Sequence, residues 1–317
     1  MNRWFLGVAA LFLTTFVHAQ IHTDLAAALL DTVPVTELRL VKLNLAEIPP
    51  DVFKLTALEV LSVAKNRLTT LPPDLAKLTK LRILDISYNE LTALPEAVGA
   101  LANLEVLECG RNAIHDIPPN FGDLKRLRIL RIERNRLEII PRSFFELSAL
   151  TELAILSNQL KFIQPEIAKL TQLEEINFSQ NELTELPDAV CKLANLEYLD
   201  LEHNFVTSLP ENLGHLAALK WLFVGDNRLA EFPPSICRIS DLVKLDVSRN
   251  RLTALPEALG ELTQLRVLYL NSNKLATLPE SLEDMTLLEK VNLRDNPLPI
   301  AKVRALRQVF PRANIIF

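Results

Sequence analysis

The side chains that could act in catalysis or hold a metal are few and scattered along this sequence. Cys109, Cys191 and Cys237 form no CxxC pair, and the histidines show no His-x-x-x-His spacing. Zinc sites are typically built from Cys and His at such short spacings. The seven glycines form neither a GxGxxG nor a GxxxxGK(S/T) motif, which a nucleotide-phosphate cradle requires. We therefore expect no metal site and no cofactor.

Asp85 and Glu108 are the best candidates for acid–base chemistry, because paired carboxylates serve as acid and base in glycoside hydrolysis. They stand 23 residues apart, which is the period of an internal repeat, so we expect them to be outward neighbours on adjacent strands. Arg111 and Arg131 lie nearby and would offset their charge. Because nothing in the sequence predicts an enclosing pocket, we interpret the pair as a solvated acidic face. We expect no catalytic residue and no enzymatic activity.

An internal repeat sets the elements that carry these side chains. Asparagines recur every 23 residues, at Asn66, Asn89, Asn112, Asn135, Asn158, Asn181, Asn204, Asn227, Asn250, Asn273 and Asn296. The pattern around each one is LxxLxLxxNxLxxLP, as in the stretch from Leu81 to Pro95. A first repeat, from Leu38 to Pro49, follows the pattern without its asparagine. The repeats thus span residues 35–298 and number about twelve.

Each position of the repeat has a physical reason. In the LxL segment the side chains alternate, so the leucines point into the solenoid and the residues between them point out of a short parallel strand. The asparagine amide both donates and accepts, so it can pair backbone groups of the turn that would otherwise be buried unpaired. The Leu-Pro pair fixes φ and removes a donor, which suits a short helical or irregular return segment.

This pattern resembles the leucine-rich-repeat family, and specifically the 23-residue LP-containing class of bacterial repeat proteins and Ras-associated scaffold proteins. The resemblance implies an α/β solenoid, a right-handed horseshoe with a concave parallel β-sheet and short helical or irregular convex segments. It also implies a protein-binding function. The cysteine-rich end modules of animal extracellular members are absent, which suggests a bacterial-type protein.

The amino terminus carries the features of an export signal. Residues 1–19 contain Arg3, an apolar stretch of about fourteen residues and small residues before Gln20, the pattern of a cleaved signal peptide. The apolar stretch is short of the roughly 20 residues that span a bilayer. We expect an exported protein that is periplasmic, at the cell surface or secreted. The alternative is a cytoplasmic protein that keeps Met1.

Both ends of the repeat array are expected to be capped, since an open solenoid exposes its core. Residues 20–34 form the predicted N-terminal cap, with a short helix from Leu25 to Leu30 that Thr23 or Asp24 would N-cap. Residues 299–317 form the predicted C-terminal cap, a helix followed by a closing strand.

The charge and the cysteines narrow the partners further. A net charge of −5 gives no broad attraction to phosphate backbones or anionic lipid, so we expect no nucleic acid partner. No stable membrane insertion after signal cleavage is expected, and we expect a monomer. Cys109 holds an inward position of its repeat and would be a core side chain. Cys191 and Cys237 lie two repeats apart, with Cα atoms about 10 Å apart and beyond disulfide reach, so we expect three free thiols.

A partner is expected on the concave face, at the positions six, four and two residues before each repeated asparagine. In the middle and later repeats the predicted partner-binding residues are Tyr198, Asp200, Glu202, Trp221, Phe223, Lys244, Asp246 and Tyr269. From Gln20 onward the chain has one Trp and three Tyr, and three of these four fall in this set. The centres of interfaces favour Trp and Tyr, although aromatic residues also favour strands in general.

The early repeats carry a stripe of outward β-branched residues that we interpret as sheet stabilisation, namely Val60, Ile83, Val106 and Ile129. From all these features we predict a non-enzymatic recognition module that acts outside the cytoplasm and binds a protein or peptide through its concave face. Two alternatives stay open. One is a cytoplasmic signalling scaffold similar to the Ras-associated group, and the other is a glycan-binding surface protein, since aromatic platforms also stack on sugars.

Overall fold

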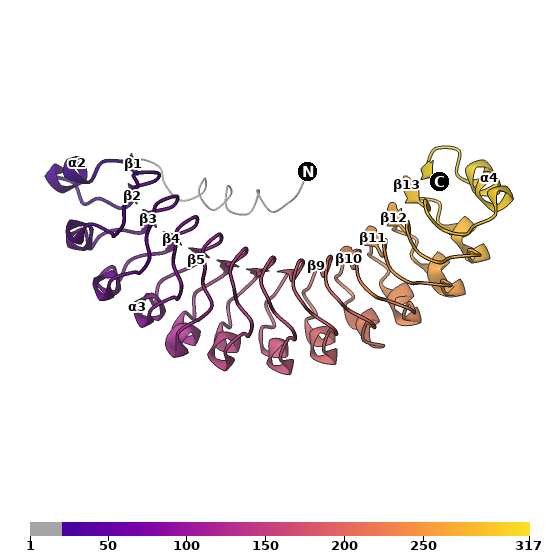
Figure 1. Ribbon diagram of the computed structural model, residues 1–317, viewed down its shortest axis with the longest axis horizontal. Coiled ribbons are helices and arrows are strands. Elements are labelled where there is room, and N and C mark those ends of the chain that lie inside the picture. Colours follow the sequence, from indigo (N-terminus) through magenta and orange to yellow (C-terminus); the bar gives the residue numbers. More distant parts are fainter. Residues whose placement is uncertain (1–20) are drawn as a thin grey trace.

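The computed structural model describes residues 21–317. The predicted signal peptide, residues 1–19, lies outside the described residues. The described chain forms a horseshoe whose inner face is one curved sheet and whose outer face carries short helices (Figure 1). Within residues 21–317 the sheet has 14 strands in sequence order, and each strand pairs in parallel with the next. This confirms the predicted parallel solenoid.

The strands of the sheet are three residues long, apart from the first. They are β1 (Ile21–His22), β2 (Glu37–Arg39), β3 (Val60–Ser62), β4 (Ile83–Asp85), β5 (Val106–Glu108), β6 (Ile129–Arg131), β7 (Glu152–Ala154), β8 (Glu175–Asn177), β9 (Tyr198–Asp200), β10 (Trp221–Phe223), β11 (Lys244–Asp246), β12 (Val267–Tyr269), β13 (Lys290–Asn292) and β14 (Asn314–Ile316). In each repeat the middle residue of the strand, such as Leu84 or Leu222, is fully buried, so its two neighbours face the concave side.

The convex elements are mostly short 3-10 helices, and in most of them the proline of the Leu-Pro pair is the N-cap residue. They are η2 (Pro50–Lys54), η3 (Pro73–Lys77), η4 (Pro119–Asp123), η5 (Arg142–Glu146), η6 (Pro165–Lys169), η7 (Asp188–Lys192), η8 (Leu213–His215), η9 (Pro234–Arg238), η10 (Glu257–Glu261) and η11 (Glu280–Asp284). One repeat instead has a short α-helix, α3 (Glu96–Gly99). The Leu-Pro pair is thus followed by a short helical return segment, as the sequence predicts, and η2, η3, η4, η6 and η9 also begin with a proline, whose fixed φ suits a first helical residue.

The repeated asparagines join neighbouring repeats through their amides. The Asn158 Nδ2 donates to the carbonyls of Ile155 (2.9 Å) and Ile132 (3.1 Å), and its Oδ1 accepts from the N–H of Leu137 (3.0 Å). The same set of bonds recurs at the other repeated asparagines, from Asn66 to Asn296. Each amide therefore pairs buried backbone groups of two repeats, which confirms the predicted role of the asparagine in pairing the backbone of the turn.

The residue before each repeated asparagine has a left-handed backbone. Eleven such residues, from Lys65 to Asp295, have φ between 51° and 58°, and none of them is glycine. A side chain in this region costs about 1–2 kcal/mol, so the turn is held by its surroundings, above all by the asparagine bonds. The sequence analysis did not foresee this feature.

The two ends of the sheet are covered by the terminal segments. Asp24 caps helix α2 (Leu25–Leu30) by accepting from the Ala26 N–H at 2.9 Å. At the other end, helix α4 (Ile300–Val309) is followed by β14, which pairs in parallel with β13. These segments protect the terminal repeats from open contact with solvent.

Candidate functional site: the concave face

The sheet register brings the predicted partner-binding residues together. In one row across the strands Tyr198, Trp221 and Lys244 are direct neighbours. In the next row Asp200, Phe223, Asp246 and Tyr269 are direct neighbours in that order, and Glu202 follows two residues after β9 ends. The eight residues thus form one continuous surface, which we call the concave patch.

Aromatic rings and lysine side chains contact one another across the concave patch. The rings of Tyr198 and Phe223 lie 5.3 Å apart between centroids. The Lys244 Nζ lies 4.5 Å from the Phe223 ring and 5.3 Å from the Tyr269 ring. Lys290, which the sequence analysis did not include, lies 5.1 Å from the other side of Tyr269. Cation–π contacts of this kind hold the rings in place, so the patch offers rigid aromatic faces beside positive charge.

Asp200 is on the concave face but is buried, with 7% of its surface exposed. Its carboxylate accepts from the Glu202 N–H (2.9 Å), the Asn177 Nδ2 (3.0 Å) and the Tyr198 hydroxyl (3.2 Å). Burial raises the pKa of the Asp200 carboxyl to about 6, and these hydrogen bonds oppose the rise. Asp200 therefore holds the Tyr198 hydroxyl and the turn after β9 through hydrogen bonds.

Glu202 and Asp246 face each other across Gly225. A Cβ atom at Gly225 would lie 3.2 Å from the Glu202 Oε1 and 3.1 Å from the Asp246 Oδ1. Burial raises the pKa of the Glu202 carboxyl to about 7, and the charges of Asp200 and Asp246 add to the rise. The missing side chain at position 225 thus leaves room for the Glu202 and Asp246 carboxylates on either side of it.

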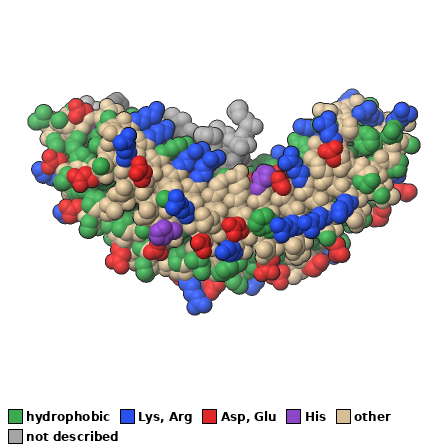
Figure 2. All heavy atoms as spheres, in the orientation of Figure 1, with side chains coloured by type: hydrophobic (Ala, Val, Ile, Leu, Met, Phe, Trp, Pro, Cys, Tyr) green, Lys and Arg blue, Asp and Glu red, His purple; other side chains and the backbone are tan. Residues whose placement is uncertain are grey.

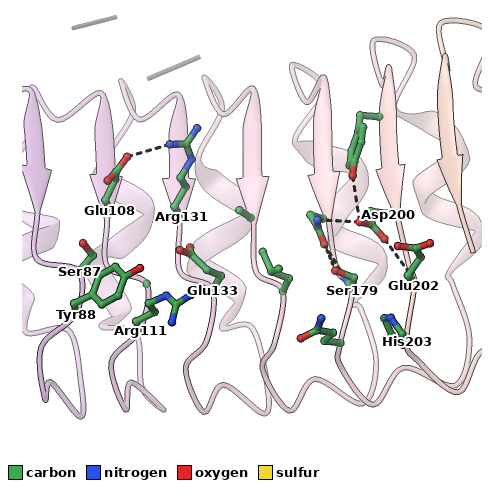
Figure 3. A pocket seen from close by; sticks show the side chains of 16 residues that line it. Ser87, Tyr88, Glu108, Arg111, Arg131, Glu133, Ser179, Asp200, Glu202 and His203 are labelled. Carbon is green, nitrogen blue, oxygen red and sulfur yellow. Dashed lines mark hydrogen bonds and ion pairs between the residues drawn. The ribbon is translucent and has the colours of Figure 1, made fainter. Parts of the chain in front are cut away.

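A hollow of about 510 Å³ lies next to the concave patch, over the repeats of β4 to β9 (Figure 3). It shares Tyr198, Asp200 and Glu202 with the patch. Its other lining residues are Ser87, Tyr88, Glu108, Gly110, Arg111, Arg131, Glu133, Ala154, Leu156, Asn177, Ser179, Gln180 and His203. The sequence analysis predicted no pocket. Three of these lining residues, Gly110, Ala154 and Ser179, are small, and the space next to Gly110 is filled by the Glu133 carboxylate.

The far end of the hollow is lined by paired charges. Arg131 reaches Glu108 at 3.1 Å and Glu152 at 2.8 Å, so it bridges the two neighbouring strands. Burial raises the pKa of the Glu108 carboxyl, with a smaller contribution from Asp85. The predicted offset of Glu108 by Arg131 is confirmed, but the predicted solvated face is wrong, because Glu108 is largely buried and lines the hollow. Arg111 instead lies 4.8 Å over the Tyr88 ring.

Further features of the described residues concern the cysteines, the groups that could bind a metal, the helices and the apolar stripe. Cys109, Cys191 and Cys237 are free and buried, as predicted. In residues 21–317 no group of Cys, His, Asp and Glu has the geometry to hold a metal ion. Over the same range no helix combines the length and the apolar character needed to span a membrane. Val60, Ile83, Val106 and Ile129 form a contiguous apolar cluster, as their spacing predicts.

Comparisons with known proteins agree with this geometry. The family model described as leucine-rich repeat region matches residues 73–189 and 185–296, and a second model, described as leucine rich repeat, matches residues 34–91. A search of curated protein sequences gave no significant match.

Solved structures share the fold at low sequence identity. An internalin of Listeria monocytogenes is 22% identical with a TM-score of 0.77, covering 88% of this chain and 81% of the internalin. A leucine-rich-repeat protein of Leptospira interrogans is 24% identical with a TM-score of 0.58, covering 94% of this chain and 100% of that protein. A plant peptide hormone receptor is 24% identical with a TM-score of 0.70, covering 84% of this chain and 48% of the receptor. The repeats, the fold and the family matches together establish that this chain belongs to the leucine-rich-repeat family.

Proposed function

We propose that this chain is a non-enzymatic recognition module that binds a protein or peptide through its concave patch. The observation that carries the proposal is the stack of Tyr198, Phe223, Lys244 and Tyr269, whose side chains are ordered by one another and remain partly exposed. Rigid aromatic groups lose little conformational freedom on binding, and interface centres are enriched in them. The plant receptor with the same fold is solved in complex with RGF2.

The hollow beside the patch extends the surface that a ligand would cover. Its walls carry the carboxylates of Glu108 and Glu133 at one end and of Asp200 and Glu202 at the other. Polar groups at fixed positions on a mostly preformed surface give orientation and specificity. A side chain or turn of the partner fits this hollow while the aromatic stack contacts the adjoining part.

The proposed site of action is outside the cytoplasm, and the protein acts as a monomer. The export proposal rests on the sequence of residues 1–19, which carries the features of a signal peptide. Amino-terminal sequencing of the mature protein tests it directly. A chain that begins at Gln20 supports export, and a chain that keeps Met1 in soluble protein contradicts it.

The binding proposal is tested by comparative capture with matched variants. The first variant combines Tyr198→Ala, Trp221→Ala and Tyr269→Ala, and each truncation at an interface centre costs about 1–4 kcal/mol. The control combines Ile139→Ala, Phe162→Ala and Leu287→Ala, which remove exposed apolar side chains outside the strands. Circular dichroism checks that both variants fold.

Each purified protein is immobilised as bait and incubated with envelope and culture-medium fractions, and the captured proteins are quantified by mass spectrometry. The proposal is supported by a protein that wild type and control capture in equal amounts, and that the Tyr198→Ala, Trp221→Ala, Tyr269→Ala variant captures at least about tenfold less. Equal capture by all three proteins contradicts it and leaves the aromatic residues as strand-forming residues only.

A further inference from the structure

A row of exposed cations runs along one edge of the later repeats, outside the concave sheet. Arg228, Arg251 and Lys274 each follow the repeated asparagine of their repeat. Their N–H groups donate to the carbonyls of Val206, Leu229 and Leu252, at 2.9, 2.8 and 2.9 Å. These equivalent bonds keep the three residues, which we call the basic row, in register. Figure 2 shows basic side chains gathered in such a row in the half of the molecule that holds the later repeats.

No residue of the basic row has an ion pair with a carboxylate in residues 21–317. Elsewhere in the chain, cations in successive repeats face acids, as Lys220 faces Glu197 at 2.7 Å and Lys169 faces Glu146 at 2.6 Å. Neighbouring strands are about 4.8 Å apart, so adjacent members of the row repel one another. Binding of an acidic partner would reduce this repulsion. The chain as a whole has a net charge of −5, so the basic row is a positively charged patch on an otherwise acidic protein.

The surroundings of the basic row leave it open to a partner. The exposed residues two positions further along each repeat are Ala230, Thr253 and Ala276, which are small and uncharged. In the preceding repeat the residue equivalent to Arg228 is Phe205, which is 41% exposed. The Arg228 guanidinium lies 4.4 Å from the Phe205 ring. The row thus has an aromatic contact at one end, and its three cations are exposed without an ion pair to a carboxylate of the described residues.

We propose that the basic row docks an acidic helix of a partner protein, with carboxylates along one face and an apolar side chain against Phe205. Helix residues three and four positions apart have Cβ atoms about 5–6 Å apart, close to the spacing of adjacent repeats. Side chains on one face of an extended strand are about 6.6 Å apart and match the row less well. Each arginine can bind a carboxylate through two parallel N–H donors.

This second surface is independent of the concave patch, so the two proposals fail or succeed separately. The probe is a short fluorescein-labelled helical peptide with glutamates one turn apart on a single face and a leucine at one end. A peptide of the same composition, with its glutamates spread around the helix, is the reference. Binding to the whole mature protein is measured by fluorescence anisotropy at about 50 mM salt, where screening is weak.

The test variant combines Arg228→Glu, Arg251→Glu and Lys274→Glu. The control combines Arg67→Glu, Arg136→Glu and Lys161→Glu, which change the net charge equally at exposed cations of earlier repeats. We expect the one-faced peptide to bind wild type and control alike, and to bind the test variant at least about tenfold more weakly. The concave triple variant is expected to bind the peptide as wild type does.

Several results overturn the proposal. If the one-faced peptide does not bind wild type at concentrations up to about 1 mM, the proposed docking of an acidic helix is wrong. Equal binding of the two peptides shows attraction by overall charge without recognition of a row. If the test variant and the control bind the one-faced peptide equally weakly, the attraction again depends on overall charge and not on the basic row. If size-exclusion chromatography shows a wild-type dimer that the test variant loses, the row joins two copies of this chain and the proposed partner is wrong.

Discussion

The Glu202 carboxyl makes the stability of the protein depend on pH in a direction that one substitution tests. Burial and the neighbouring charges of Asp200 and Asp246 raise its pKa from 4.5 to about 7 in the folded chain. The folded state therefore holds the proton more tightly than the unfolded state does. The free energy of unfolding is highest when Glu202 is protonated, and this contribution is lost as the pH rises from about 4.5 through about 7.

Glu202→Gln removes this dependence, because the amide resembles the protonated carboxyl and stays neutral. A pKa difference of about 2.5 corresponds to about 3.5 kcal/mol at full ionisation, since one pKa unit is worth about 1.4 kcal/mol. Glu202 is only partly buried, and solvent screening lowers the figure to about 1–2 kcal/mol. We expect the variant to match wild type at pH 4.5 and to exceed it by this amount at pH 8.

Urea unfolding at the two pH values, followed by circular dichroism, gives the free energies. Glu182→Gln, at an exposed site outside the sheet, is the control and is expected to leave the difference between the two pH values unchanged. A Glu202→Gln variant that is less stable than wild type at pH 8, or whose advantage is the same at both pH values, refutes the reasoning. Either result would mean that the carboxylate is well solvated or compensated in the folded chain.

Three further predictions follow from the repeats. Asn158→Ala leaves the Leu137 N–H and two buried carbonyls without their partner, so we expect a loss of about 2–4 kcal/mol in urea unfolding, against almost none for the exposed Gln159→Ala. Ser157 has φ of 55°, so Ser157→Gly is expected to be about 1 kcal/mol more stable than Ser157→Ala; equal stabilities would show that the turn is unstrained. The three cysteines are buried and their pKa values are raised by burial, so a thiol reagent at pH 8 should label none in the native protein and all three in denaturant.

The repeat architecture was predictable because each position meets the same surroundings every 23 residues. Asn158 is one of eleven asparagines with the same bonds, and a buried amide in that turn has few alternatives. The strand register follows from the same period, so the neighbours in the concave patch could be assigned before the structure was known. The aromatic contacts between Tyr198, Phe223 and Lys244 follow from that register.

Features that depend on missing side chains or on backbone geometry were not predictable. The hollow is lined by side chains from six successive repeats, and its shape depends on how each of them is oriented, as when the Glu133 carboxylate fills the space next to Gly110. The left-handed residues before the asparagines include Lys65 and Tyr88, whose types do not demand that conformation. Asp200 was placed on the correct face, but its burial depends on hydrogen bonds from a neighbouring strand.

The most direct measurement of the central claim is site-specific photo-crosslinking to the partner identified by capture. A photoreactive phenylalanine replaces Phe223 in the concave patch in one protein, and Phe162, which is exposed and outside the strands, in another. If the partner occupies the concave face, the first protein forms the crosslinked adduct and the second does not. Adducts from position 162 alone, or equal adducts from both positions, would contradict the claim that the concave patch is the binding site.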